Sequence, residues 1–191
     1  MQNTRVIRSQ TVDAVCAALV CHLAESDYEP RYDSEGDFEA AIWDRVRDFM
    51  STLHFDPQYS CLTSHVERVG RSQDAWDAFL KDERGPDVRA LGSNNRLDIV
   101  VKCDTLGSIG LEVKCLGDDR NADRLVHGIG QATLALENRD RTILIVFCGG
   151  IEQADRPRLR QVLDRATRGS RVSIVLVPYA IRQAPADAIT G

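Results

Sequence analysis

The amino-acid sequence predicts an α/β protein with a mixed central sheet flanked by helices. Apolar residues recur at helical spacing near the N-terminus, and from residue 96 onward β-branched segments alternate with helical ones. A hairpin followed by helix, strand, helix and strand produces a sheet with both antiparallel and parallel pairs. The chain has 191 residues, 43% of them hydrophobic and 28% charged, which suffices for one domain with a sizeable core.

Two helices are expected in the first third of the chain. Residues 9–25 place apolar side chains at three- and four-residue spacing, with Ser9 or Thr11 as the N-cap. Residues 26–36 are polar, contain Pro30 and Gly36, and predict a loop. The second helix is expected at residues 37–53, where Phe38, Ala41, Ile42, Val46, Phe49, Met50 and Leu53 form an apolar stripe.

Residues 54–95 have a less regular pattern. A short helix is expected at residues 73–81, which include Trp76, Phe79 and Leu80. Residues 88–91 predict a short strand, and the sequence Gly-Ser-Asn-Asn at 92–95 predicts a turn after it.

The pattern is sharpest in the second half of the chain. Residues 96–103 (RLDIVVKC) and 111–116 (LEVKCL) predict two strands of a hairpin, joined by a turn region at 104–110 that holds two glycines. After a polar loop at 117–123, we expect a helix at 125–137, a buried strand at 141–148, an arginine-rich helix at 155–167 and a last strand at 171–178.

Composition narrows the classes of protein. A net charge of −5 argues against coating nucleic acid by bulk attraction, while one local basic surface remains compatible. No apolar run approaches the ~20 residues of a membrane span, and no secretory signal is evident, so we expect a cytoplasmic protein without membrane contact. The six cysteines lack metal-ligand spacing and predict buried free thiols rather than structural zinc or an iron–sulfur cluster.

Asp98, Glu112 and Lys114 carry the functional prediction. Side chains alternate faces along a strand, so Glu112 and Lys114 point the same way. If the hairpin pairs even-numbered residues with even-numbered ones, Asp98 joins them on that face. Carboxylates bind Mg²⁺, a bound cation acidifies an attacking water, and a nearby lysine holds that water or stabilises charge on a phosphate. The three residues therefore suit phosphodiester hydrolysis.

The spacing of Asp98 and Glu112-Val113-Lys114 resembles the signature of the PD-(D/E)xK nuclease superfamily, which includes restriction enzymes, Holliday-junction resolvases and RecB-type nucleases. The proline that precedes the aspartate in that signature is Leu97 here. The resemblance implies a restriction-endonuclease-like core of helix, β-meander, helix and strand at residues 37–148. Residues 1–35 would be an N-terminal helical extension and 155–178 a C-terminal helix and strand, all within one domain spanning 1–191.

The resemblance also implies an activity, namely metal-dependent hydrolysis of nucleic-acid phosphodiester bonds, with DNA as the expected substrate and Mg²⁺ or Mn²⁺ as the cofactor. A homodimer is a further expectation, since compact nucleases of this kind often pair to cut two strands. The catalytic set would be Asp98, Glu112, Lys114, Glu39 and Gln131. Asp98 and Glu112 would hold the metal with help from Glu39, for which Asp37 and Glu35 are alternatives.

Each of these residues also has an ordinary interpretation. Glu-x-Lys on an exposed strand is a solvated pattern, Glu39 near a helix start favours the helix dipole, and Gln131 could be a plain surface residue. Lys102 lies on the Asp98 face if the strand is regular and could reach a phosphate or remain solvated. His127 precedes Gln131 by one helical turn and could face the same site, but we assign it no catalytic role.

Arginines cluster between residues 156 and 171. Arg156, Arg158 and Arg160 are candidates for binding a nucleic-acid backbone, because arginine suits phosphate recognition. The alternative is a solvated helix whose arginines pair with Glu152, Asp155 and Asp164.

Two other functional classes remain open. A nuclease fold without activity could act as a nucleic-acid-binding or scaffold subunit, because fold does not dictate function. A small-molecule enzyme on a flavodoxin-like sheet would require that residues 96–116 do not form a hairpin.

Overall fold

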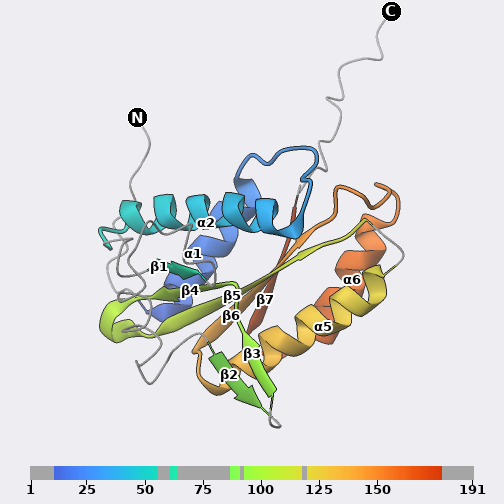
Figure 1. Cartoon of the computed structure of the whole chain (residues 1–191). Helices are drawn as coiled ribbons and strands as arrows, with labels where there is room; N and C mark the ends of the chain where they lie inside the picture. The colour runs from blue at the N-terminus through green and yellow to red at the C-terminus, as the bar shows by residue number, and fades with distance from the viewer. Residues whose placement is uncertain (1–10, 56–60, 64–86, 91–92, 118–119, 178–191) are drawn as a thin grey trace, which may run out of the picture.

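The central sheet combines antiparallel and parallel strands (Figure 1). The computed structural model describes residues 11–55, 61–63, 87–90, 93–117 and 120–177. Within them, five strands pair in the order β1-β4-β5-β6-β7, antiparallel from β1 to β5 and parallel from β5 to β7. Their bounds are Cys61–Thr63, Ile99–Lys102, Ser108–Cys115, Arg141–Phe147 and Val172–Val177. The prediction of an α/β protein with a mixed, helix-flanked sheet is therefore confirmed.

Helices cover both faces of this sheet (Figure 1). On one face lie α1 (Val12–Glu25) and α2 (Glu35–Thr52), and on the other lie α5 (Asn121–Leu134) and α6 (Arg156–Ala166). Two short 3₁₀ turns, η2 (Asp104–Leu106) and η3 (Ala135–Glu137), connect elements. None of the described helices has the length and apolarity needed to cross a membrane.

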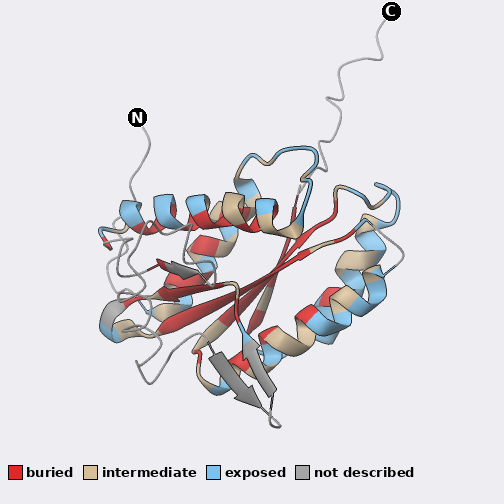
Figure 2. Cartoon of the chain, viewed as in Figure 1, coloured by how far each residue is buried: buried red, intermediate tan, exposed pale blue. Residues whose placement is uncertain are grey.

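The core divides by strand parity, because successive side chains point to opposite faces of a sheet. Odd-numbered residues such as Leu111, Val113 and Ile145 pack with α1 and α2. Even-numbered residues such as Leu144 and Val146 pack with α5 and α6. Figure 2 shows buried residues along the sheet and along the sides of the helices that face it. Glu112 and Lys114 are even-numbered and therefore belong to the α5 side.

The register of the hairpin matches the prediction. Ile99 lies opposite Leu111 and Lys102 lies opposite Ser108, so even-numbered residues pair with even-numbered ones. The antiparallel pairing of β4 with β5 also rules out the flavodoxin-like alternative, which required that this hairpin be absent.

Several element boundaries differ from the predictions. The turn expected at residues 92–95 is wrong, because Ser93–Arg96 forms β3 and pairs with β2 (Asp87–Ala90). The turn region expected at 104–110 ends earlier, since β5 begins at Ser108. Gly110 lies within that strand, where a Cβ atom would come 2.5 Å from Leu97 Cδ1, so this glycine marks a close packing contact rather than a turn.

Other predicted segments are shifted or undescribed. The strand expected at 96–103 begins only at Ile99, because the chain bends at Asp98. The helix expected at 125–137 begins at Asn121. Strand β1 was not predicted, and the helix expected at 73–81 lies outside the described residues.

All six cysteines are free thiols. Cys16, Cys61, Cys103 and Cys148 are buried as expected, whereas Cys21 is exposed and Cys115 is half-buried.

Helix α2 begins with a hydrogen-bonded cap that fixes its start. The Ser34 hydroxyl donates to Asp37 Oδ2 at 2.6 Å and accepts from the Asp37 N–H at 3.1 Å. This reciprocal contact satisfies a backbone donor that the first helical turn would otherwise leave unpaired. The cap therefore fixes the position of Glu35, the first residue of α2, and the direction in which its side chain projects from the helix.

We expect Ser34→Ala to lower the free energy of unfolding by about 1 kcal/mol, because alanine cannot accept the Asp37 N–H. Equilibrium urea denaturation measures this change. Ser51→Ala is the matched control, since the exposed Ser51 hydroxyl only donates to the Arg47 carbonyl later in the same helix. Equal effects of the two substitutions would contradict the assigned role of the cap.

Candidate functional site

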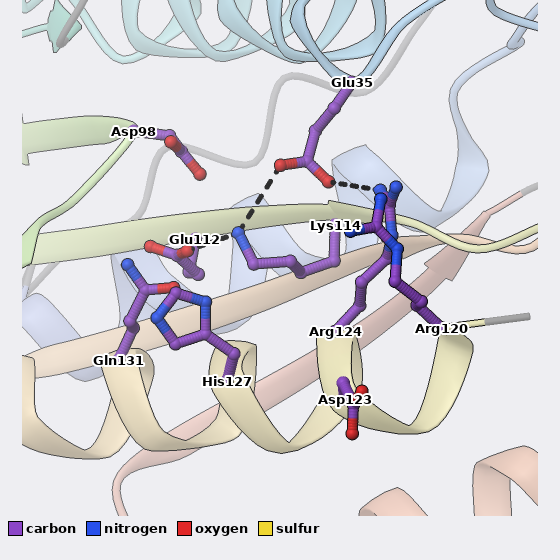
Figure 3. Close-up of a pocket in the computed structure, with 9 residues that line it drawn as sticks. All are labelled: Glu35, Asp98, Glu112, Lys114, Arg120, Asp123, Arg124, His127 and Gln131. Atoms are coloured by element: carbon purple, nitrogen blue, oxygen red, sulfur yellow. Dashed lines mark ion pairs between the residues drawn. The ribbon is translucent and has the colours of Figure 1, made fainter. Parts of the chain in front are cut away.

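A cleft of about 520 Å³ opens where β5 ends between the start of α2 and the side of α5 (Figure 3). Its walls carry both acidic and basic groups. The lining residues are Glu35, Asp98, Glu112, Lys114, Arg120, Asp123, Arg124, His127 and Gln131.

Two carboxylates occupy the edge of β5 that β4 leaves open. Strand β4 begins at Ile99, opposite Leu111, so within the described part of the chain residues 112–115 of β5 have no strand partner on that side. Asp98 Oδ2 accepts the Val113 N–H at 2.7 Å, and Glu35 Oε2 accepts the Cys115 N–H at 3.0 Å. An unpaired backbone N–H at a buried edge is costly. The geometry of the sheet therefore holds both carboxylates beside the cleft.

Glu112 and Lys114 form a buried pair at the floor of the cleft. Their residues are only 1% and 7% exposed, and Lys114 Nζ lies 2.6 Å from Glu112 Oε1. This short contact lacks the direction of a hydrogen bond, and neither Glu112 oxygen has a hydrogen-bond partner among the described residues. The Lys114 ammonium instead donates to the Val113 carbonyl at 2.9 Å. Glu112 Oε1 thus contacts the Lys114 ammonium as an ion pair, and Oε2 has no hydrogen-bond partner among the described residues.

Gln131 contributes a second acceptor of this kind. Its Oε1 is buried without a hydrogen-bond partner among the described residues, and its side chain points from α5 toward Glu112 (Figure 3). Buried acceptors of hydrogen bonds are normally satisfied. Glu112 and Gln131 thus present acceptor oxygens to the same cleft.

Burial and charge shift the titration of this pair. Burial and the Asp98 carboxylate raise the pKa of Glu112 against the opposing effect of the Lys114 ammonium, to a net value of about 8. For Lys114, burial disfavours the ammonium, yet the charges of Glu112 and Asp98 together outweigh burial and raise its pKa. Both shifts favour proton retention, at Glu112 chiefly because of burial and at Lys114 because of the neighbouring carboxylates.

Basic groups lie on the α5 side and at the mouth of the cleft. Arg124 Nη1 donates to the Cys115 carbonyl at 3.3 Å and lies 3.6 Å from Glu35 Oε2. Arg120, one turn earlier on the chain, lines the same cleft, and His127 is exposed there.

The Cys115 thiol beside the cleft is not activated as a nucleophile. Burial and the Glu35 carboxylate raise its pKa to about 12, so the thiol stays protonated.

The structure brings together four of the five residues predicted to be catalytic. Asp98, Glu112, Lys114 and Gln131 all line the cleft. Glu39 does not line it, and is buried one helical turn further along α2. Glu35, which was an alternative to Glu39, is the α2 carboxylate in the cleft.

The α6 arginines predicted to bind nucleic acid do not line the cleft. Arg160 forms an ion pair with Asp164 at 2.8 Å, and Arg156 donates to the Ile151 carbonyl at 3.3 Å. Arg160 therefore agrees with the alternative interpretation, in which the helix is solvated and its arginines pair with acidic residues. Lys102 also lies away from the cleft, at the far end of β4 opposite Ser108.

Sequence reasoning missed the two cleft arginines. Arg120, Arg124, His127 and Gln131 follow a spacing of four, three and four residues, which is the repeat of one helix face. Extending that repeat backward from Gln131 would have identified both arginines. The sequence pattern instead predicted a loop at residues 117–123 and a helix that began at residue 125, so neither arginine was assigned to the helix face.

The donor set fits a hard divalent cation in part. Among the described residues no group of three or more His, Cys, Asp or Glu side chains is arranged to hold a metal ion. The cleft instead offers two carboxylates, Asp98 and Glu112, and the amide oxygen of Gln131. Mg²⁺ prefers oxygen ligands, retains several waters and is often held by one or two carboxylates, so the cleft offers the type of donor that this ion takes.

Comparisons of the chain with protein-family models, with curated proteins and with solved structures give no match.

Glu112 makes the stability of the protein depend on pH. The folded state retains a proton at Glu112 up to about pH 8, whereas an unfolded chain releases it near the usual pKa of 4.5. The free energy of unfolding should therefore fall as pH rises between these values, by at most about 1.4 kcal/mol per pH unit.

Equilibrium urea denaturation of the wild type and of Glu112→Gln, in chelator and across this pH interval, tests that slope. Glutamine keeps the shape of the side chain but cannot ionise. We expect the wild type to lose stability relative to the variant as pH rises. Parallel pH profiles of the two proteins would show that Glu112 titrates normally.

Proposed function

We propose that this protein is a metal-dependent nuclease that hydrolyses phosphodiester bonds, with DNA as the expected substrate. The observation that carries the proposal is the buried Glu112 carboxylate. Its Oε2 has no hydrogen-bond partner among the described residues, Lys114 Nζ lies 2.6 Å from its Oε1, and the residue shares one cleft with Asp98, Lys114 and Gln131. A cation at this carboxylate would supply the missing partner and offset the raised pKa.

The order of elements supports a restriction-endonuclease-like core. Helix α2 is followed by the antiparallel strands β1, β4 and β5, then by α5 and by β6 parallel to β5. This order agrees with the helix, meander, helix and strand that the Asp98 and Glu112-Val113-Lys114 spacing implied. The β2-β3 hairpin is inserted between β1 and β4.

Asp98 and Glu112 would hold Mg²⁺ or Mn²⁺, and Gln131 would support the site through its amide oxygen. When bound, the cation acidifies an attacking water and offsets negative charge on the phosphate. Asp98 is preorganised for this role because the Val113 N–H fixes one carboxylate oxygen. We retain Glu39 only as an indirect contributor, because Glu39 does not line the cleft.

Lys114 is the candidate for orienting water. Its ammonium is positioned by Glu112 and by the Val113 carbonyl at the floor of the cleft. A fixed ammonium in a partly dry site stabilises charge that develops on a phosphate oxygen or holds the attacking water. Arg120 and Arg124 would bind neighbouring phosphates without reading sequence.

A catalytically inactive nucleic-acid-binding subunit is the second candidate function. Among the described residues, the lack of three convergent metal-binding side chains favours it. The Lys114 ammonium, 2.6 Å from Glu112, also neutralises the carboxylate without any metal. Such a protein would bind nucleic acid through the cleft arginines and leave it intact.

We expect Lys114→Ala and Asp98→Asn each to reduce DNA cleavage by about 100-fold or more, because each removes a group that acts in the transition state. Asparagine keeps an oxygen for the Val113 N–H, so the fold should survive. The measurement is cleavage of linear, circular, single-stranded and branched DNA, and of RNA, with Mg²⁺ or Mn²⁺ and with EDTA.

Asp48→Asn is the matched control, since Asp48 is an exposed α2 carboxylate that does not line the cleft. A titration with Mn²⁺ separates the two candidate functions. The nuclease should bind Mn²⁺ and lose that binding in Asp98→Asn. Unchanged cleavage by both cleft variants, or no cleavage and no Mn²⁺ binding by the wild type, would refute the nuclease proposal.

A further inference from the structure

Three donors converge on the Glu35 carboxylate, and Figure 3 draws the two side-chain donors, Lys114 and Arg124. The Cys115 N–H donates to Oε2 at 3.0 Å, Arg124 Nη1 lies 3.6 Å from the same oxygen, and Lys114 Nζ lies 3.6 Å from Oε1. An ammonium, a guanidinium and a backbone N–H around one anion are the groups that bind phosphate in proteins. Glu35 therefore occupies a position that suits a phosphate.

The donors keep their positions without help from Glu35. Lys114 is held by Glu112 at 2.6 Å and by the Val113 carbonyl at 2.9 Å. Arg124 donates to the Cys115 carbonyl at 3.3 Å, and the Cys115 N–H belongs to β5. Departure of the Glu35 side chain would leave the donors in place.

Glu35 itself is placed where it can leave. It is the first residue of α2, and its side chain is 37% exposed. Partly exposed ion pairs contribute little stability, so rotation of this side chain into solvent costs little. A polyanion that contacts all three donors can therefore displace it.

We propose that Lys114, Arg124 and the Cys115 N–H form a phosphate subsite for a nucleic-acid backbone, and that the Glu35 carboxylate fills this subsite when no substrate is bound. The inference rests on the proposed function for the identity of the polyanion. Lys114 belongs to this subsite and also contacts Glu112. A phosphate bound there would therefore lie close to the Glu112 carboxylate. Arg120, one turn before Arg124, extends the basic side of the cleft.

The competing role for Glu35 is that of a third metal ligand. Its oxygens already face donors, with the Cys115 N–H and Arg124 at Oε2 and Lys114 at Oε1. Glu112 differs in its partners and in its burial. Lys114 Nζ lies 2.6 Å from its Oε1, its Oε2 has no hydrogen-bond partner among the described residues, and the residue is 1% exposed. Glu35, with donors at both oxygens and a 37% exposed side chain, is the glutamate that a phosphate can replace.

Fluorescence anisotropy of a short fluorescein-labelled oligothymidylate, in low salt with chelator, tests the subsite. Glu35→Gln keeps the acceptor for the Cys115 N–H but removes the charge that competes with phosphate. We expect binding to tighten about tenfold, as when a closed state populated to about 90% is removed. Adding Arg124→Gln to this variant should abolish the gain, and inorganic phosphate should compete for binding.

Asp33→Asn is the matched control for long-range charge. Asp33 lies two residues before Glu35 on the chain, is exposed, and does not line the cleft. Its effect should stay below about twofold, because solvent and salt screen an exposed charge. The subsite proposal is overturned if Glu35→Gln binds no more tightly than Asp33→Asn, or if Glu35→Gln weakens Mn²⁺ binding without tightening oligonucleotide binding.

The binding assay needs no metal and no cleavage. Loss of cleavage in the Asp98 and Lys114 variants tests the nuclease, whereas the response of Glu35→Gln tests the phosphate subsite. Tighter binding by Glu35→Gln in a protein that cleaves nothing would support the subsite and refute the nuclease.

Discussion

The divergence of β4 from β5 is the constraint on which the candidate site depends. The two strands pair only as far as Ile99 and Leu111, and β5 continues to Cys115 without that partner. Backbone N–H groups along the open edge need acceptors, and carboxylates from Asp98 and Glu35 supply them. A requirement of the backbone thus brings acidic side chains from a distant helix and from the bend before β4 to one place.

Burial of Glu112 and Lys114 lowers the stability of the fold. Both residues lie on the face of β5 that packs against α5, opposite Leu144 and Val146 on β6. Apolar residues at such positions would often serve stability as well or better, because taking two charges out of water is expensive. Gly128 makes room for this pair, since a Cβ there would come 2.9 Å from Lys114 Cγ. A buried pair of ionisable groups kept at such cost is typical of a functional site.

The cleft divides into two halves with opposite electrostatic preference. Glu112, Asp98 and Gln131 present oxygens and favour a cation. Arg124, Arg120 and the Cys115 N–H present donors and favour an anion. Lys114 lies between them and contacts Glu112 and Glu35. Phosphodiester hydrolysis needs a cation site and a phosphate site side by side. Lys114 contacts residues of both, and therefore has a role in the proposed activity and in the proposed phosphate subsite.

Local periodicity in the sequence determined much of the fold and part of the site. Alternation along residues 111–116 was enough to place Glu112 and Lys114 on one face, and helical spacing placed the apolar faces of α1 and α2. These features depend on residues close in the chain, so the backbone repeat specifies them. The even-to-even pairing of the hairpin was predicted only as a condition, because register also depends on the turn and on packing.

Only the tertiary structure decided which distant residues meet at the cleft. Glu35 and Glu39 lie one turn apart on α2, and the choice between them depends on where that helix crosses the end of β5. The bend at Asp98 could not be predicted for the same reason. The Asp98 carboxylate accepts a hydrogen bond from the Val113 N–H, which lies across the hairpin. The arginines of α6 are plentiful in the sequence, yet that helix does not contribute to the cleft. Contacts between segments far apart in the chain are set by packing of the whole fold, and no local repeat encodes them.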